Sequence, residues 1–145
     1  MMAFQLRPIA EEDLPELLAF WGRTPGVGLN ESDTPECLKR YLDRNPGLSV
    51  IARSGEGIAG AVLCGHDGRR GYLNHLAVAE SFRRQGLGRQ MAEHCLAGLH
   101  RLGIRRCTIC LFADNEAGRE FWSNCGWKQR SDLVMMQRPC AVIGG

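Results

Sequence analysis

Residues 78–91, VAESFRRQGLGRQM, place two glycines one residue apart at the start of a segment with helical periodicity. An apolar, strand-like run, YLNHLAV at residues 72–78, leads into this stretch. The first N–H groups of a helix have no partner within the helix, and the helix dipole adds partial positive charge there. Because glycine has no Cβ, Gly86 and Gly88 let an anion approach these N–H groups closely. Together with the arginines of the stretch, they predict a site for a phosphate or pyrophosphate group.

Two common nucleotide-binding motifs also put glycines at a strand-to-helix junction, and neither fits. A P-loop requires GxxxxGK followed by Ser or Thr, which the chain lacks. The dinucleotide fingerprint requires a third glycine where Met91 stands and an acidic residue at the end of the next strand. The glycines therefore predict an anion site of another kind.

Composition limits the other possibilities. At 145 residues and 44% hydrophobic content, we expect one domain spanning residues 1–145. A net charge of +2 is too small for a protein that coats nucleic acid. The sequence shows neither a membrane span nor a secretory signal, so we expect a cytoplasmic protein. Its seven cysteines fit small buried side chains, and CTIC at 107–110 has no second Cys/His pair, so we expect no metal.

Periodicity and turn residues predict strands and helices along the whole chain. Asp13 is expected to cap the first helix, with Glu16 completing a capping box. The run 105–112 is apolar on both faces, which favours a central strand. These patterns indicate an α/β (α+β) fold: a mixed, mostly antiparallel sheet of six or seven strands, a central parallel βαβ pair and helices on both faces. The predicted strands are 4–10, 48–54, 57–64, 72–78, 105–112 and 127–138, and the predicted helices are 13–21, 34–45, 89–103 and 115–126.

The motif RxxGxG, formed by Arg83, Gly86 and Gly88, resembles the acyl-CoA loop of the GNAT superfamily of N-acetyltransferases. Two longer segments, LAVAESFRRQGLG and NEAGREFWSNCGW, are similar to that superfamily's signatures, and the predicted order of elements matches its fold. The resemblance covers nearly the whole chain. It implies acetyl-CoA as co-substrate and an amine as acceptor.

The resemblance also implies which residues bind the cofactor. The strand that ends at Val78 would hydrogen-bond the pantetheine arm through its backbone, and the amides of the glycine loop would hold the pyrophosphate. The asparagine before the last helix would lie near the same arm. The implied cofactor-binding residues are Leu76, Ala77, Val78, Arg83, Arg84, Gln85, Gly86, Leu87, Gly88, Arg89 and Asn115.

For catalysis, the resemblance implies direct attack of the amine on the thioester, with the backbone N–H of Val78 polarising the oxyanion. Candidates for the base are Asn74 and His75, with Glu80 just beyond them; only His75 and Glu80 titrate, and the ordinary pKa of histidine is suitable. The alternative is that His75 is a hydrogen-bonded sheet residue that moves no proton. Trp122 stands where the family usually has a proton-donating tyrosine, and an indole N–H cannot replace that group. We expect Trp122 to pack in the core.

The loop GVGLNESDT, at 26–34, corresponds to the part of the family that shapes the acceptor pocket. Its acidic residues Glu31 and Asp33 are candidates to attract a cationic amine. The alternative is that they serve the solubility of the loop or the cap of the next helix.

These observations lead to two functional hypotheses. The first is an N-acetyltransferase that uses acetyl-CoA to modify a primary amine of a small molecule, peptide or protein, acting as a monomer or homodimer. The second is a non-catalytic acyl-CoA-binding regulatory module, which the absent tyrosine favours. Binding to nucleic acid is disfavoured by the modest charge, and no membrane partner is expected.

Overall fold

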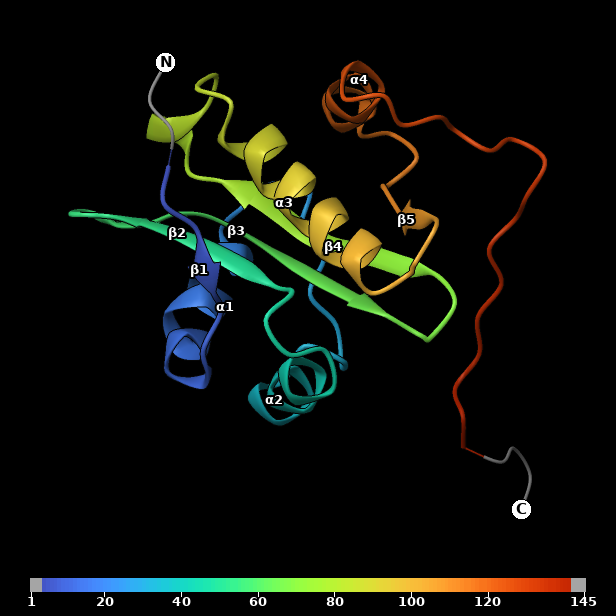
Figure 1. Cartoon of the computed structure of the whole chain (residues 1–145), viewed down its shortest axis with the longest axis horizontal. Coiled ribbons are helices and arrows are strands. Elements are labelled where there is room, and N and C mark those ends of the chain that lie inside the picture. Colours follow the sequence, from blue (N-terminus) through green and yellow to red (C-terminus); the bar gives the residue numbers. More distant parts are fainter. Residues whose placement is uncertain (1–3, 142–145) are drawn as a thin grey trace.

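A sheet in the order β1-β2-β3-β4-β5 forms the centre of residues 4–141, the part of the chain that the computed structural model describes (Figure 1). Neighbours from β1 to β4 are antiparallel, whereas β4 and β5 pair in parallel. The prediction of a mixed α/β fold with a mostly antiparallel sheet is confirmed. The strands are β1 (Arg7–Pro8), β2 (Val50–Ser54), β3 (Gly57–His66), β4 (Gly71–Val78) and β5 (Cys107–Ile109).

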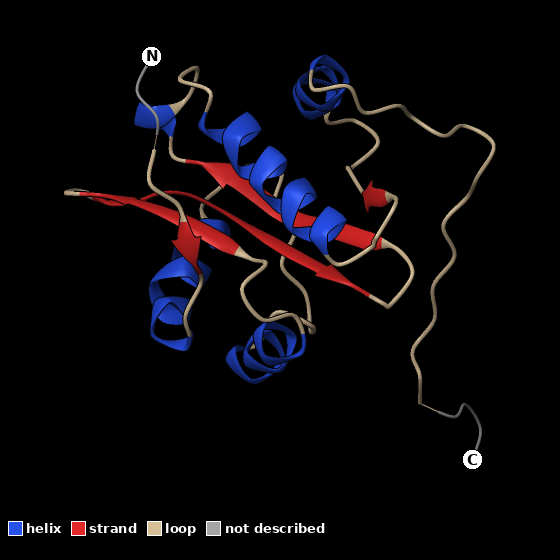
Figure 2. Ribbon diagram, in the orientation of Figure 1, coloured by secondary structure: helices blue, strands red, loops and turns tan. Residues whose placement is uncertain are grey.

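Helices cover both faces of the sheet, as predicted (Figure 2). Side chains alternate along β2: Val50 and Ala52 join the core beneath α3 (Leu87–Arg101), while Ile51 joins the core beneath α1 (Leu14–Gly22) and α2 (Pro35–Arg44). The stripe of α3 that faces the sheet includes Met91, as the periodicity predicted. No helix among residues 4–141 has both the length and the apolar character that a membrane crossing requires.

Helix caps formed where short-range sequence signals indicated them. The Thr34 side chain accepts a hydrogen bond from the Cys37 N–H at 3.2 Å, and Pro35 occupies the first position of α2. The Asn115 side chain accepts from the Gly118 N–H at 2.9 Å and caps α4 (Glu116–Asn124). Two short 3₁₀ turns, Glu11–Asp13 and Glu80–Phe82, lead into α1 and toward α3.

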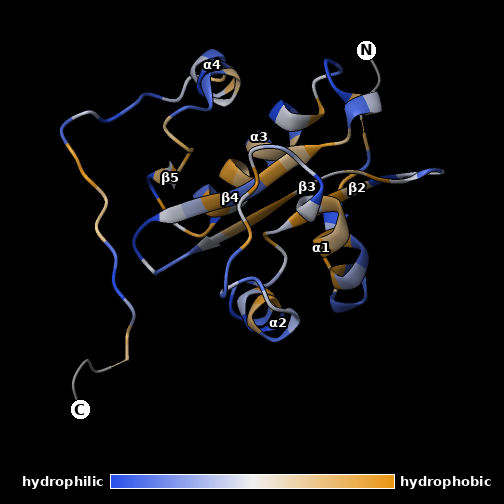
Figure 3. Cartoon of the chain, turned by 180° about the vertical axis from the view of Figure 1, so that it is seen from behind, coloured by the Kyte–Doolittle hydropathy of each residue, from blue (hydrophilic) through white to orange (hydrophobic). Residues whose placement is uncertain are grey.

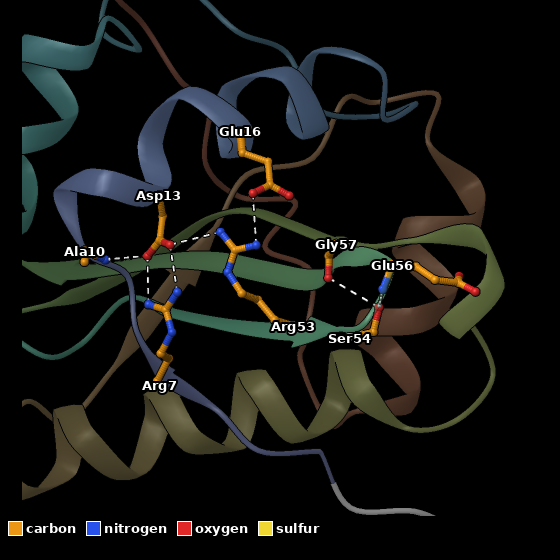
Figure 4. Close-up of polar contacts among 8 residues, drawn as sticks. All are labelled: Arg7, Ala10, Asp13, Glu16, Arg53, Ser54, Glu56 and Gly57. Carbon is orange, nitrogen blue, oxygen red and sulfur yellow. Dashed lines mark hydrogen bonds and ion pairs between the residues drawn. The ribbon is translucent and has the colours of Figure 1, made fainter.

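Asp13 is the N-cap residue of α1, as predicted, but the predicted capping hydrogen bond from its side chain is absent from the described structure. Its backbone is already helical (φ −77°, ψ −20°) because a 3₁₀ turn precedes it, whereas a capping side chain needs an extended backbone. The carboxylate instead accepts from Arg7 at 2.7 Å and Arg53 at 3.0 Å, and from the Ala10 N–H at 2.8 Å (Figure 4). Glu16 does not close a capping box but pairs with Arg53 at 2.9 Å.

The predicted count of six or seven strands is also wrong, because the described residues form five. The first strand shrinks to Arg7–Pro8, where proline has no N–H to donate. β5 keeps only three residues of the predicted 105–112 and is an edge rather than a central strand. The segment 127–138 is no strand: it runs away from the sheet and meets no strand edge there (Figures 1 and 2).

Candidate functional site

The parallel ladder between β4 and β5 ends at the pair Leu73 and Ile109. Beyond it, Asn74, Ala77 and Val78 of β4 still pair with β3, but residues 74–78 have no ladder partner on the β5 side within residues 4–141. The β3–β4 register also shifts here, because Asn74 pairs with Leu63 while Ala77 pairs with Ala61. This irregularity is a bulge, which bends a strand and disrupts its ladder. The second half of β4 therefore presents an open side.

Backbone groups of β4 point to that open side. The Ala79 N–H donates to the Ala59 carbonyl at 2.8 Å, so the preceding residue, Val78, directs its N–H and C=O away from β3. The same alternation turns Leu76 to the open side and Ala77 toward Ala61 of β3. Ala77, predicted as a cofactor contact, thus has its backbone groups engaged within the sheet.

Arg83 connects the end of β4 to the glycine loop. Its Nε donates to the Val78 carbonyl at 3.1 Å. The guanidinium therefore braces the strand end, and the Val78 N–H is left on the open side. The neighbouring residues Arg84 and Arg89 are exposed, and the Gln85 side chain donates to the Ser81 carbonyl at 3.4 Å.

The N-terminus of α3 lies directly after this loop. Gly86 is its N-cap, with a left-handed backbone (φ 81°) and no side-chain cap in the described structure. Arg84 is left-handed too (φ 63°), so the chain turns sharply before the helix. The first helical bond runs from the Gln90 N–H to the Gly86 carbonyl, which leaves the N–H groups of Leu87 to Arg89 at the bare helix end. Such an end is suited to an anion.

Gly88 has a different role from Gly86. Its φ is not positive, and a Cβ built on it would lie 3.1 Å from Cζ of Phe121. Glycine at this position lets the ring of Phe121 on α4 approach α3. The sequence pointed to the motif but not to this contact, because Phe121 belongs to a later helix.

The loop formed by residues 26–34 lies against the segment between β5 and α4. A Cβ on Gly26 would lie 3.3 Å from Nδ2 of Asn115, and a Cβ on Gly28 would lie 2.7 Å from Cζ of Phe112. The loop passes between α1 and α2 across the sheet in the view of Figure 3. The first residues of the loop therefore lie near the start of α4. Its last residues lie near β4.

His75 and Asp33 meet in the structure. Nε2 of His75 lies 2.9 Å from Oδ1 of Asp33, and only 15% and 8% of the two side chains are exposed. Oδ2 of Asp33 accepts from the Asn30 N–H at 2.9 Å, and the imidazole packs against the edge of Trp21 with ring centroids 5.1 Å apart. The backbone of His75 is left-handed (φ 56°), a conformation that residues other than glycine adopt rarely and at some cost in strain.

Other predicted residues are placed apart from this pair. Glu31 is exposed and forms no ion pair in the described structure. Asn74 is exposed, close to the hydroxyl of Tyr41 on α2. That hydroxyl is buried with no hydrogen-bond partner among residues 4–141, and burial raises the pKa of Tyr41. Sequence reasoning missed Tyr41 because nothing in the helical pattern of α2 distinguishes it from a core residue.

Trp122 packs in the core, as expected. Its exposed fraction is 7%, and it stacks edge-to-face between Phe121 and Trp127, with centroid distances of 5.1 and 5.0 Å. Each contact of this kind adds to the stability gained by burial.

Comparisons with known proteins agree with this architecture. The model of the acetyltransferase (GNAT) family matches residues 11–127. An acetyltransferase of Yersinia enterocolitica is 24% identical over 135 residues, which cover 92% of this chain and 94% of that protein. An acetyltransferase of Pectobacterium atrosepticum is 26% identical over 114 residues, covering 78% and 79%.

Solved structures share the fold. An acetyltransferase of the GNAT family from Staphylococcus aureus superposes with a TM-score of 0.75 at 16% identity, covering 91% of this chain and 90% of that one. AAC(6')-Iy in complex with a bisubstrate analogue, CoA-S-monomethyl-acetylneamine, gives a TM-score of 0.75 at 13% identity, covering 96% and 100%. Structural likeness at such identities shows the fold alone, whereas the family match extends over most of the sequence. The chain belongs to the acetyltransferase (GNAT) family.

Proposed function

We propose that this chain is an N-acetyltransferase that transfers the acetyl group of acetyl-CoA to a primary amine of a small molecule, peptide or protein. Family membership and the acetyltransferase relatives support acyl transfer as the reaction class. The observation that carries the proposal of acetyl-CoA as co-substrate is the open side of β4 at residues 74–78. The chain leads from there to the bare N-terminus of α3.

The residues of this region fit the two polar parts of coenzyme A. The amide-containing pantetheine arm can add to β4 as an extra strand, because Leu76 and the N–H of Val78 face the open side. The pyrophosphate fits the N–H groups of Leu87 to Arg89, where the left-handed Gly86 carries no side chain to obstruct it. Arg84 and Arg89 add positive charge at the same end.

The proposed reaction is direct attack of the neutral amine on the thioester carbonyl. A C–N bond forms, the C–S bond breaks, and the sulfur leaves as the thiolate of CoA. The proposed donor to the oxyanion is the N–H of Val78, because it faces the open side of β4. No covalent enzyme intermediate is required. Without a tyrosine at position 122, the thiolate takes its proton from solvent, which an ordinary thiol pKa of about 8.5 permits.

The amine must also lose a proton, and we assign that role to His75. When Asp33 accepts a hydrogen bond from Nε2–H, the other ring nitrogen, Nδ1, is left as the proton acceptor. Asp33 then fixes the tautomer of His75, and with only 8% of its side chain exposed it offers little surface to the amine. The strained backbone of His75 supports a functional role, since strain of this kind collects at active sites.

The proposal is tested by two measurements on the full chain. Acetyl-CoA is titrated in a thermal-shift experiment, and release of CoA is followed across aminoglycosides, polyamines and peptides. Release is measured by chromatography, because the exposed thiols of Cys110 and Cys140 would react with a thiol reagent. We expect stabilisation by acetyl-CoA and turnover with at least one amine.

The same experiment tests the second candidate. The second candidate is a regulatory module that binds acyl-CoA without catalysis. It is favoured because position 122 holds a buried tryptophan, which has no hydroxyl to protonate a leaving thiolate. Stabilisation by acetyl-CoA with no turnover on any acceptor would support that module. If acetyl-CoA caused no stabilisation and no acceptor gave turnover, both candidates would be rejected.

A further inference from the structure

One face of the sheet is left partly uncovered next to the candidate site. On β4, Gly71 and Leu73 face the core beneath α3. Because side chains alternate along a strand, Tyr72 and Asn74 lie on the opposite face, the side of α1 and α2. Tyr72 is 38% exposed, and Asn74 is exposed as well. Figure 3 views the sheet from this side, and neither α1 nor α2 lies over the start of β4 in it.

Two arginines lie side by side at the beginning of this face. Gly71 and Cys107 are partners in the parallel ladder, and the Gly71 N–H donates to the Arg106 carbonyl at 2.9 Å. The residues that precede the two partners, Arg70 and Arg106, therefore occupy neighbouring positions, with about 5 Å between their backbones. Since Gly71 and Cys107 face the core beneath α3, alternation directs both arginines to the uncovered side.

This arginine pair has no acidic partner in the described structure. Both side chains are exposed, and neither forms an ion pair among residues 4–141. The carboxylate of Asp67 is engaged within its own turn: it accepts from the N–H groups of Arg69 and Arg70 at 2.8 and 2.9 Å, and its other oxygen lies 3.4 Å from the Tyr72 hydroxyl. Like charges at neighbouring positions of two strands repel each other. An anion would relieve that repulsion, and guanidinium groups suit a carboxylate.

The uncovered face leads from the arginine pair to His75. We call it the uncovered strip; it consists of Arg70, Tyr72, Asn74, Arg106 and Thr108. Arg70 precedes His75 by five positions, which corresponds to about 17 Å of strand. An extended polypeptide covers that distance in about five residues.

The far end of the strip has the opposite charge. Asp33 contacts His75 there, and Glu31, two positions before it, is exposed and forms no ion pair in the described structure. A cationic amine is attracted to this end, and an anion is attracted to the arginine pair. The strip is therefore complementary to a ligand that carries an amine at one end and an acidic group about 17 Å away.

We propose that the acceptor is a polypeptide whose amine reaches His75 and whose acidic side chain, about five residues further along, binds Arg70 and Arg106. This inference rests on the proposed function for its amine end, since that function places the amine at His75. A small amine is too short to reach both ends of the strip. A nucleic acid fits less well than a polypeptide, because the strip has one arginine pair at one end and the acidic Glu31 at the other.

Peptides of eight residues with a free N-terminal amine test the proposal. The peptides consist of glycine and serine, except that each carries a single glutamate at one position from 2 to 8. Release of CoA from acetyl-CoA gives kcat and KM for each. We expect the highest kcat/KM with glutamate at positions 5 and 6, about fivefold to tenfold above the peptide with glutamine there. The gain should appear in KM rather than kcat, because the contact is remote from the reacting bond.

Charge reversal identifies the residues that read the glutamate. Arg70→Glu and Arg106→Glu, each alone, should abolish the preference for glutamate and favour lysine at the same peptide position. The matched control is Arg101→Glu, which makes the same charge change at an exposed residue of α3, on the other side of the sheet, and should keep the preference. All three side chains are exposed, so the variants should keep the circular dichroism spectrum of the wild type.

Binding measured without turnover separates this proposal from the proposed function. The probe is a peptide labelled at its C-terminus, followed by fluorescence anisotropy in the presence of CoA. If no acceptor gave turnover, the proposed function would fail, whereas glutamate-dependent binding that Arg106→Glu abolishes would still support a polypeptide on the strip. Turnover of peptides regardless of the glutamate position, or turnover of small amines with no peptide binding, would overturn the present proposal alone. An RNA oligonucleotide that displaces the peptide and loses its affinity in Arg106→Glu would overturn it as well.

Discussion

At the scale of single residues, His75 combines a strained backbone with a ring held between Asp33 and Trp21. Glycine adopts its φ of 56° without strain, so His75→Gly removes the imidazole and leaves a space of the same shape. We expect kcat to fall by about 10²–10⁴-fold with little change in acetyl-CoA affinity. Imidazole added to the solution should restore part of the rate, measured as CoA release.

The matched control for this prediction is His94→Gly, at an exposed histidine of α3. It should keep its rate and show no response to imidazole. If His75→Gly kept full kcat, His75 would be the hydrogen-bonded sheet residue of the alternative interpretation. If it lost the rate without rescue, the ring would act through structure rather than through proton transfer.

Trp122→Phe tests whether Trp122 only packs in the core or also takes part in catalysis. The side chain lies in the core between Phe121 and Trp127, so we expect the smaller ring to cost about 1–3 kcal/mol of unfolding free energy. Most of kcat should remain, because an indole N–H cannot protonate a thiolate. The stability is read from urea denaturation and kcat from CoA release. A folded variant with almost no kcat would contradict this view.

Single residues of the candidate site were proposed from the sequence, but the side chains that they contact could not be. His75 and Asp33 were each chosen for their chemistry, one as a base and one as a contact for a cationic amine. They are 42 positions apart, and their hydrogen bond depends on how the loop 26–34 crosses the sheet. Likewise Gly88 was recognised as part of a motif, whereas its contact with Phe121 required the packing of two helices.

At the scale of elements, the contact between α3 and α4 predicts a difference between two similar substitutions. Gly88→Ala brings a Cβ to 3.1 Å from Phe121, and Gly98→Ala, in the same helix, brings one to 3.0 Å from Leu48. Both changes gain about 1 kcal/mol of helix propensity. We expect only Gly88→Ala to displace α4 with its capping Asn115, weakening acetyl-CoA binding on the order of tenfold. Calorimetric titration with acetyl-CoA measures this, and equal affinities in the two variants would refute it.

Elements whose signals are local were predicted well, and elements that depend on a distant partner were not. The caps Thr34 and Asn115 need only residues three positions away, so sequence alone located α2 and α4. A strand needs an edge to pair with. The segments 105–112 and 127–138 have strand composition, but the number of residues that pair depends on the bulge in β4 and on the path that the chain takes after α4.

At the scale of the whole molecule, the carboxylate of Asp13 joins three elements through Arg7 of β1, Arg53 of β2 and the start of α1 (Figure 4). Its side chain is 6% exposed, and the hydrogen bond from Arg7, followed by those from Ala10 and Arg53, holds the pKa of Asp13 well below its usual range. This network ties the N-terminal segment to the sheet, so its effect should appear in the unfolding of the entire domain.

The sign of the pH dependence follows from the lowered pKa. The folded state binds the Asp13 proton more weakly than the unfolded state, whose carboxyl has the ordinary pKa of about 3.9. The network therefore contributes its full stability above about pH 5 and loses it as pH falls toward the folded pKa. Asp13→Asn should cost about 1–3 kcal/mol at pH 7, and its deficit relative to wild type should shrink as pH falls from 5 to 2. Urea denaturation at a series of pH values measures both curves. Curves that stay parallel down to pH 2 would show that Asp13 keeps no lowered pKa in the folded chain, and the arginines would then hold the strands together without it.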